Sequence, residues 1–282
     1  MCPYMRYNSA VNSTSDLRAR LLALYDALHQ HFGHEPHWWP IITDTPQFEI
    51  FVGAVLVQQT RWETVEAAIR RLHAAGLLAP AALAAAHTPA LAALIRPCAF
   101  HEQKAAGLQA ICQRLVASYG GTLAALLDQP RAPLRTELLA LPRIGPETAD
   151  TIMLYAGGHP VFIVDAYTRR LFARLDLVPG FDFARTRYDQ VQALIEDALL
   201  PWTPDTASYP HLDGSLRHFL WDLHALIIEE CIHHCLATNL RQDRPGLRRA
   251  FVDPRKCATH CLVCLGCPLR TSCATYQMKR ET

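Results

Sequence analysis

The chain has 282 residues, half of them hydrophobic, which suffices for one large domain or two ordinary ones with a buried core. Its 27 basic and 26 acidic residues nearly balance, and this excludes a histone-like or strongly basic tail protein. Only Lys104, Lys256 and Lys279 are lysines, so chemistry that needs a lysine nucleophile has few candidate positions.

Apolar residues recur at helical spacing through most of the chain, beginning with leucines from Leu17 that follow the helix-capping residues Ser15 and Asp16. Strong β-strand alternation is absent, and residues 161–164 are the only short β-branched run. The pattern therefore predicts an all-α fold. Further helices are predicted at residues 48–59, 62–72, 81–86, 89–95, 102–118, 134–141, 166–176, 184–199 and 213–236.

Neither the N-terminus nor the longest uncharged stretch has the character of a membrane segment. Residues 1–15 are polar and lack the apolar core of a signal peptide. Residues 72–95 are alanine-rich and are divided by Pro80 and Pro89, which favours two short helices over one span. We expect a cytoplasmic protein with no membrane partner.

Five of the ten cysteines lie close together, in the order Cys257-x3-Cys261-x2-Cys264-x2-Cys267-x5-Cys273. Thiolates gather this tightly to hold a soft metal, and a cluster at one end of a chain is not typical of a disulfide framework. Four sulfurs suit either zinc or a cubane iron–sulfur cluster.

A turn between two predicted helices reads Leu-Pro-Arg-Ile-Gly-Pro-Glu-Thr-Ala-Asp over residues 141–150. Gly145 would let backbone amides approach a phosphate closely, and the following helix start adds its positive end. This pattern alone is weak, because many helix turns look like it. Asp165 follows the β-branched run, where it is suited to begin a helix as its N-cap.

Taken together, these motifs resemble the endonuclease III family of helix-hairpin-helix DNA glycosylases. Without Cys261 the cysteine spacing is Cys-x6-Cys-x2-Cys-x5-Cys, which is similar to the iron–sulfur loop of that family. The resemblance implies a [4Fe–4S] cluster within residues 257–273, and Cys261 departs from its pattern. The implied ligands are Cys257, Cys264, Cys267 and Cys273.

The resemblance also implies roles for the hairpin and the aspartate. Asp165 stands 18 residues after Glu147, at the offset of the family's catalytic aspartate, and Arg143, Ile144 and Gly145 are the implied DNA contacts. The family's usual hairpin is Leu-Pro-Gly-Val-Gly with a lysine two residues on, whereas this chain has Arg143 and Glu147 there. Glu147 cannot form the Schiff base through which bifunctional members cut the strand.

The segment after the first predicted helix resembles the family's base-reading elements. Gln58 is the implied wedge that fills the gap left by a flipped base, while Ala54 replaces the glutamate of the adenine glycosylase branch. Trp38 and Trp39 are the implied walls of the base pocket, since flat aromatic faces stack on cationic alkylpurines. This run is similar to the type III 3-methyladenine DNA glycosylases, and in such a run Lys104 is structural.

The resemblance implies a two-lobed molecule, with a six-helix lobe at residues 38–159 and a second lobe formed by 1–37 with 160–282. We expect a monomeric, monofunctional enzyme that excises a damaged base, most plausibly an alkylated purine, from double-stranded DNA in the nucleoid. One alternative is an endonuclease III-type oxidised-pyrimidine glycosylase without its lyase step. Another is a non-enzymatic iron–sulfur protein that binds DNA.

Overall fold

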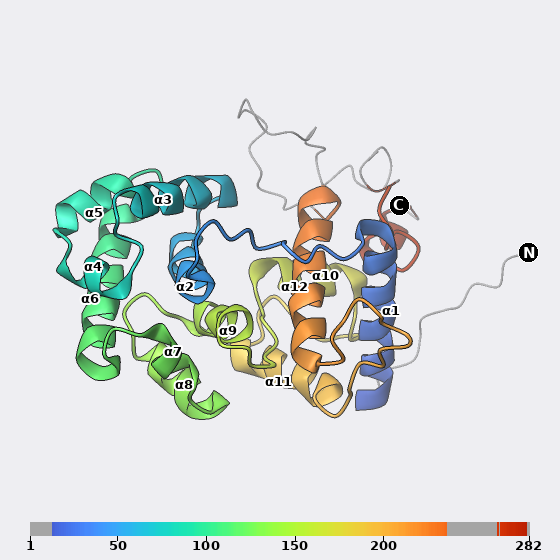
Figure 1. Ribbon diagram of the computed structural model, residues 1–282. Helices are drawn as coiled ribbons and strands as arrows, with labels where there is room; N and C mark the ends of the chain where they lie inside the picture. The colour runs from blue at the N-terminus through green and yellow to red at the C-terminus, as the bar shows by residue number, and fades with distance from the viewer. Residues whose placement is uncertain (1–12, 236–263, 265, 281–282) are drawn as a thin grey trace, which may run out of the picture. The chain divides into compact units, whose positions relative to one another are not determined.

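The computed structural model describes residues 13–235, 264 and 266–280 (Figure 1). Every regular element in these ranges is a helix, which confirms the predicted all-α class. The chain clusters into two compact units. We call residues 36–161 the hairpin unit, and the described parts of residues 1–35 and 162–282 the terminal unit.

The hairpin unit is built around α2, which is buried along residues 48–56 and packs against α3, α6 and α9. Its described residues form eight helices, of which α4, α5 and α7 are short and α7 was not predicted. Proline at the first turn begins α4 and α5, and both pack on α6. The bounds are α2 Pro46–Leu56, α3 Trp62–Ala74, α4 Pro80–Ala85, α5 Thr88–Leu94, α6 His101–Tyr119, α7 Leu123–Leu127, α8 Arg131–Leu139 and α9 Pro146–Tyr155.

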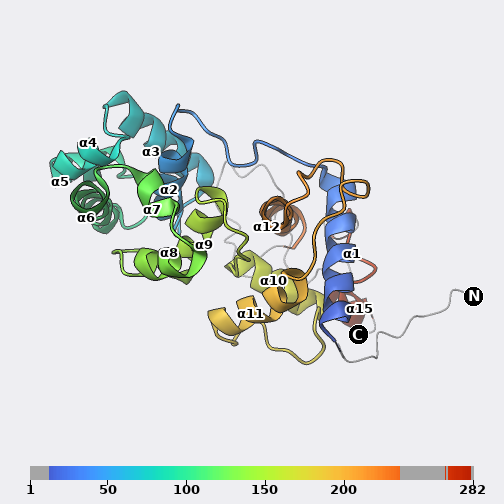
Figure 2. The same ribbon diagram turned by 60° about the horizontal axis from the view of Figure 1, so that its bottom comes forward.

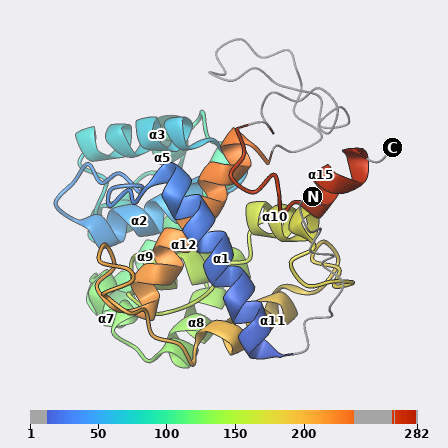
Figure 3. The ribbon, with the colours of Figure 1, turned by 90° about the vertical axis from the view of Figure 1, so that its right-hand side faces the viewer.

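The terminal unit joins a helix from the start of the chain to helices from its second half. In it α1 packs on α11 and α12, while α10 packs on α12 and α15 (Figures 2 and 3). The helix α12 is shorter than predicted because Ser215 caps it, with the side-chain oxygen accepting from the amide of His218 at 3.2 Å. The bounds are α1 Thr14–Phe32, α10 Ala166–Leu175, α11 Tyr188–Leu199, α12 Leu216–His233 and α15 Ala274–Arg280.

The β-branched run at residues 161–164 is extended but pairs with no strand in the described part of the chain. Side chains of α11 take the place of a strand partner. The amide of Phe162 donates to Glu196 Oε1 at 2.9 Å, and Gln192 Nε2 donates to the carbonyl of Phe162 at 2.8 Å. This pairing holds the chain straight into residue 165, where α10 is about to begin. None of the described helices is long and apolar enough to cross a membrane.

Candidate active site

Asp165 is the N-cap of α10 and is only 6% exposed. Its Oδ1 accepts a hydrogen bond from the amide of Thr168 at 2.7 Å, as an N-cap carboxylate should. The cap fixes the side chain in one orientation, and the positive end of α10 stabilises its negative charge. Asp165 is therefore a rigid carboxylate whose second oxygen, Oδ2, takes no part in the cap.

His224 of α12 faces that second oxygen, with its Nε2 3.9 Å from Asp165 Oδ2. Burial lowers the pKa of His224 below that of an ordinary histidine, so the ring is neutral at neutral pH. Asp165 therefore faces a neutral ring on this side and not a cation. Sequence reasoning missed His224, because it is one of three histidines in α12 and no motif distinguishes it from the other two.

The two helices of the hairpin, α8 and α9, are joined by a buried ion pair. Arg135 donates to both oxygens of Asp150, Nε to Oδ1 at 2.7 Å and Nη2 to Oδ2 at 3.1 Å. Asp150 is fully buried, so this two-point contact is shielded from water. The ion pair ties α8 to α9 on either side of the turn and so fixes the angle between the two helices.

The turn itself has a left-handed residue at Arg143, whose φ is +66°. Glycine adopts that conformation without the strain that a side chain brings, which gives a physical reason for glycine in the family's pattern. The arginine stem lies against α6, where a Cβ added to Gly107 would come within 2.7 Å of Arg143 Cγ. Ile144 is buried at 6% exposure, so its side chain is not available to a ligand.

Gly145 is the N-cap of α9, has an ordinary φ of −93° and is exposed. A Cβ added there would meet nothing within 4 Å, so the protein's own packing does not require glycine. The open space leaves room for a group that approaches the backbone closely. Glu147, in the first turn of α9, is also exposed.

Gln58 is the one predicted base-reading residue that the structure brings to the hairpin. Its Nε2 donates to the carbonyl of Arg143 at 2.8 Å and to Thr148 Oγ1 at 3.1 Å. The amide nitrogen is therefore used inside the protein, and insertion into a duplex would require it to leave these partners. The next residue, Gln59, is left-handed with φ +54°, so the chain turns sharply away from α2 here.

Lys104 lies beneath this turn and is completely buried. Its Nζ donates to the carbonyls of Leu56 and Gln58 at 2.8 and 2.7 Å and to Thr60 Oγ1 at 3.1 Å. Burial lowers the pKa of Lys104 to about 8. With three acceptors engaged, the amine anchors the end of α2 and is held away from solvent.

An aromatic group surrounds the two predicted pocket residues. The centroid of the Trp39 ring lies 5.2 Å from that of Trp62 and 5.1 Å from that of Tyr155. The ring centroids of Trp38 and Tyr155 are 6.2 Å apart. Gly53 of α2 makes room for it, since a Cβ there would lie 3.1 Å from the Trp39 ring. The indole nitrogens of Trp39 and Trp62 are buried donors with no acceptor in the part of the chain that the structure describes.

Of the cluster cysteines, Cys257 and Cys261 lie outside the described residues, while Cys264, Cys267 and Cys273 lie within them. The amide of Cys267 donates to the carbonyl of Cys264 at 3.3 Å, so one tight turn presents both side chains. Cys273 begins the turn before α15, with its Sγ 3.7 Å from the carbonyl oxygen of Arg174.

Two further acidic or thiol groups from the end of α12 face these cysteines. Cys267 Sγ lies 3.0 Å from Oε1 of Glu230, which is fully buried, and burial raises the pKa of Glu230 to about 8. Cys235 Sγ lies 3.3 Å from the guanidinium of Arg174, the residue whose carbonyl contacts Cys273. Hydrogen bonding by Cys231, together with nearby Arg174, lowers the pKa of Cys235.

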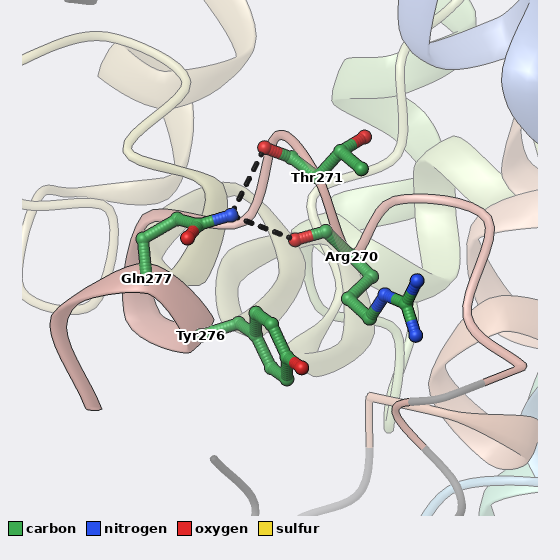
Figure 4. Close-up of a pocket in the computed structure, with 4 residues that line it drawn as sticks. All are labelled: Arg270, Thr271, Tyr276 and Gln277. Carbon is green, nitrogen blue, oxygen red and sulfur yellow. Dashed lines mark hydrogen bonds between the residues drawn. The ribbon is translucent and has the colours of Figure 1, made fainter. Parts of the chain in front are cut away.

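Thiolates are the donors that hold an iron–sulfur cluster, and buried or charged hydrogen-bonding groups surround these cysteines. Within the described residues, however, their sulfurs are not gathered into one metal-ligand group, and Cys264 is disulfide-bonded. The loop beyond them is held by Gln277, whose Nε2 donates to the carbonyls of Arg270 and Thr271 at 3.5 and 3.3 Å. With Tyr276, these residues line an open polar depression (Figure 4).

Comparison with known proteins places this arrangement in a family. The family model described as "HhH-GPD superfamily base excision DNA repair protein" matches residues 52–198. MJ1434 of Methanocaldococcus jannaschii, provisionally described as a DNA repair glycosylase, is 35% identical over 213 residues, which cover 75% of this chain and 87% of that protein.

Two solved structures share the fold. A non-covalent endonuclease III–DNA complex superposes with a TM-score of 0.65 and 20% identity, over 94% of this chain and 99% of that one. The H. pylori 3-methyladenine DNA glycosylase MagIII bound to 1,N6-ethenoadenine superposes with a TM-score of 0.60 and 24% identity, over 77% of this chain and 96% of that one. The chain therefore belongs to the HhH-GPD superfamily of base excision DNA repair proteins, as an endonuclease III-like DNA glycosylase.

Proposed function

We propose that the protein is a monofunctional glycosylase that hydrolyses the N-glycosidic bond of an alkylated purine in double-stranded DNA, with Asp165 as its catalytic carboxylate. The observation that carries the proposal is the geometry of Asp165: one oxygen is locked in the α10 cap and the other faces a neutral His224. Breaking the bond builds positive charge on the sugar, and a fixed anion stabilises that charge. The same carboxylate can orient or deprotonate the attacking water.

We expect no strand cleavage, because none of the lysine side chains stands at the position of the family's nucleophile. Strand cleavage by this superfamily needs a lysine that attacks the sugar, and Glu147 stands at the position of that lysine. Lys104, whose side chain the structure describes, is buried and donates to three acceptors. Lys256 lies outside the described residues, and no motif aligns it with the family's nucleophile.

The preference for an alkylated purine rests on the aromatic group of the hairpin unit. Trp38 and Trp39 offer flat faces that stack on a cationic base, and the buried indole donors of Trp39 and Trp62 await an acceptor. Alkylation also makes the base a good leaving group, so strong acid catalysis is unnecessary. A structural neighbour with bound ethenoadenine supports a modified purine as ligand.

DNA contact is assigned to the hairpin and Gln58. The exposed backbone at Gly145, at the positive end of α9, suits a phosphate oxygen, and the exposed Arg143 adds positive charge. Gln58 would insert into the duplex once it leaves Arg143 and Thr148.

A [4Fe–4S] cluster is proposed as the resident cofactor, held by Cys264, Cys267 and Cys273 with a fourth thiolate. The spacing predicts Cys257 as that fourth ligand, and Cys257 lies outside the described residues. When bound, the cluster would supply a rigid cross-link within the C-terminal loop.

A second candidate is an oxidised-pyrimidine glycosylase without lyase activity, favoured by the fold shared with endonuclease III. Base release from duplexes that contain 3-methyladenine, hypoxanthine, thymine glycol or uracil separates the two. We expect release of 3-methyladenine, and release of thymine glycol alone would refute the alkylpurine assignment. A borohydride trap tests the chemistry, since a covalent enzyme–DNA adduct would contradict a monofunctional enzyme.

A further inference from the structure

A second cluster of polar side chains lies in the terminal unit, where α1 packs on α12 (Figure 3). Tyr25 and His29 come from one face of α1, and Asp222 comes from α12. His211 reaches the cluster from the loop that precedes α12, and His34 from the turn that follows α1. None of these residues takes part in the catalytic or iron–sulfur assignments above.

Three of these side chains present metal-ligand atoms to one point. The ligand atoms of His29, His211 and Asp222 all lie within 4.8 Å of one another, and the described part of the chain contains one such group. The carboxylate of Asp222 is 2% exposed. Two imidazoles and a buried carboxylate are donors that zinc binds in proteins.

The hydrogen bonds of the cluster leave one buried atom unexplained. The Tyr25 hydroxyl lies 2.7 Å from Asp222 Oδ2 and 2.6 Å from His211 Nε2, and His34 Nδ1 lies 2.8 Å from Asp222 Oδ1. His29 Nδ1 is buried, has no hydrogen-bond partner among the described residues and lies 4.0 Å from Asp222 Oδ2. A buried nitrogen without a partner costs free energy unless something binds to it.

The rings of His29 and His211 lie close together. They are stacked, with centroids 3.9 Å apart and planes within 10°. Imidazole nitrogens bind a metal through lone pairs that lie in the ring plane, so one ring turns out of this stack when both bind the same ion.

We propose that His29, His211 and Asp222 bind one divalent zinc ion, with the Tyr25 hydroxyl beside the fourth position. Zinc–nitrogen bonds are about 2.0–2.1 Å long, so the ligand atoms, which lie within 4.8 Å of one another, must draw together on binding. His34 donates to the outer oxygen of Asp222 and orients the carboxylate. The ion links α1, α12 and the loop around His211, a role that stands whether or not the glycosylase assignment holds.

The test is zinc binding by the full-length protein with its iron–sulfur cluster loaded. Protein equilibrated with zinc and freed of excess by gel filtration should retain one zinc per chain by elemental analysis. The variants His29→Ala and His211→Ala should lose that equivalent, and His34→Ala should weaken it about 10- to 100-fold. His218→Ala is the matched control, because this neighbouring histidine lies outside the ligand group, and it should bind as the wild type does.

Cobalt separates this site from the cysteines. Cobalt(II) bound by nitrogen and oxygen gives weak visible bands, whereas thiolate ligation adds intense charge-transfer bands. We expect weak cobalt bands in the wild type and none in His211→Ala. Zinc should raise the melting temperature of the wild type but not that of His211→Ala. The proposal is overturned if the wild type retains no zinc, if both ligand variants retain it, or if the bound cobalt has thiolate bands. Circular dichroism of the metal-free variants confirms that each is folded.

Discussion

Asp165 combines two tasks in one side chain, since it begins α10 and supplies the proposed catalytic charge. Asparagine caps a helix about as well as aspartate does, so Asp165→Asn removes the charge and leaves the cap in place. We expect base release to fall about 100- to 1,000-fold while DNA binding persists, as for the loss of one electrostatic stabiliser. Single-turnover base release and a gel-shift titration measure the two properties.

The matched control for that variant is Asp182→Asn, which changes another aspartate that caps a turn in the terminal unit. It should leave base release unchanged. Wild-type release by Asp165→Asn would instead favour a protein that binds DNA without acting on it.

Sequence reasoning reached single residues where a motif marked them and missed those that only the fold brings together. Asp165 follows a β-branched run and Gly145 ends a turn, so local pattern sufficed for both. No motif marks His224 among the histidines of α12, and Tyr25 meets Asp222 across 197 positions of the chain. Such long-range contacts depend on packing, which spacing does not reveal.

Element boundaries follow the same rule. The prolines in the first turns of α4 and α5 allowed the starts of both helices to be predicted well. A proline in the first turn favours a helix start through its own backbone geometry, without tertiary contacts. The start of α11 was expected at residue 184 but comes at Tyr188, since Asp182 accepts from the amides of Ala184 and Arg185 and forms a separate turn. The spacing of apolar residues does not reveal a side chain that competes with the helix for backbone amides.

At the level of the hairpin, the pair between Arg135 and Asp150 decides whether α8 and α9 keep their angle. Asp150→Ala leaves the guanidinium without its buried partner, and we expect a loss of about 3 kcal/mol in unfolding free energy. Urea denaturation measures it. As a control, Glu66→Ala removes the exposed partner of Arg70 and should cost about 0.5 kcal/mol or less. Equal losses in the two variants would show that Asp150 is not held as described.

The end of α12 and the C-terminal loop meet at the cysteines, and their variants decide which thiolate completes the cluster. Cys257→Ser should abolish bound iron and inorganic sulfide, as Cys267→Ser should. Cys235→Ser should retain both, because Cys235 lies outside the spacing that predicts the ligands. Iron and sulfide are assayed after anaerobic purification, with visible absorbance as a second readout. Iron kept in Cys257→Ser and lost in Cys235→Ser would instead make Cys235 the fourth ligand.

Across the whole molecule, buried histidines make stability depend on mildly acidic pH. Burial lowers the pKa values of His211, His218 and His224 in the folded protein. At a pH below the ordinary histidine pKa of about 6.5, these histidines therefore bind more protons in the unfolded chain than in the folded protein. The unfolding free energy should fall as the pH drops from 7 to 5.5, by up to about 1.4 kcal/mol per pH unit for each histidine.

Urea denaturation across that pH range measures the slope. His224→Gln should flatten it by up to one proton, while His73→Gln, a change at an exposed position on α3, should leave it unchanged. A slope identical in His224→Gln and the wild type would contradict the described burial of His224.

The contact between Gly107 and Arg143 has a consequence for how this protein can evolve. The stem of Arg143 occupies the space that a side chain at position 107 would need. A larger residue at position 107 becomes tolerable only after position 143 has lost its side chain, and glycine at 143 would also relieve the left-handed strain there. The two positions should therefore change together among relatives. A relative that keeps arginine at position 143 should also keep glycine at position 107 of α6.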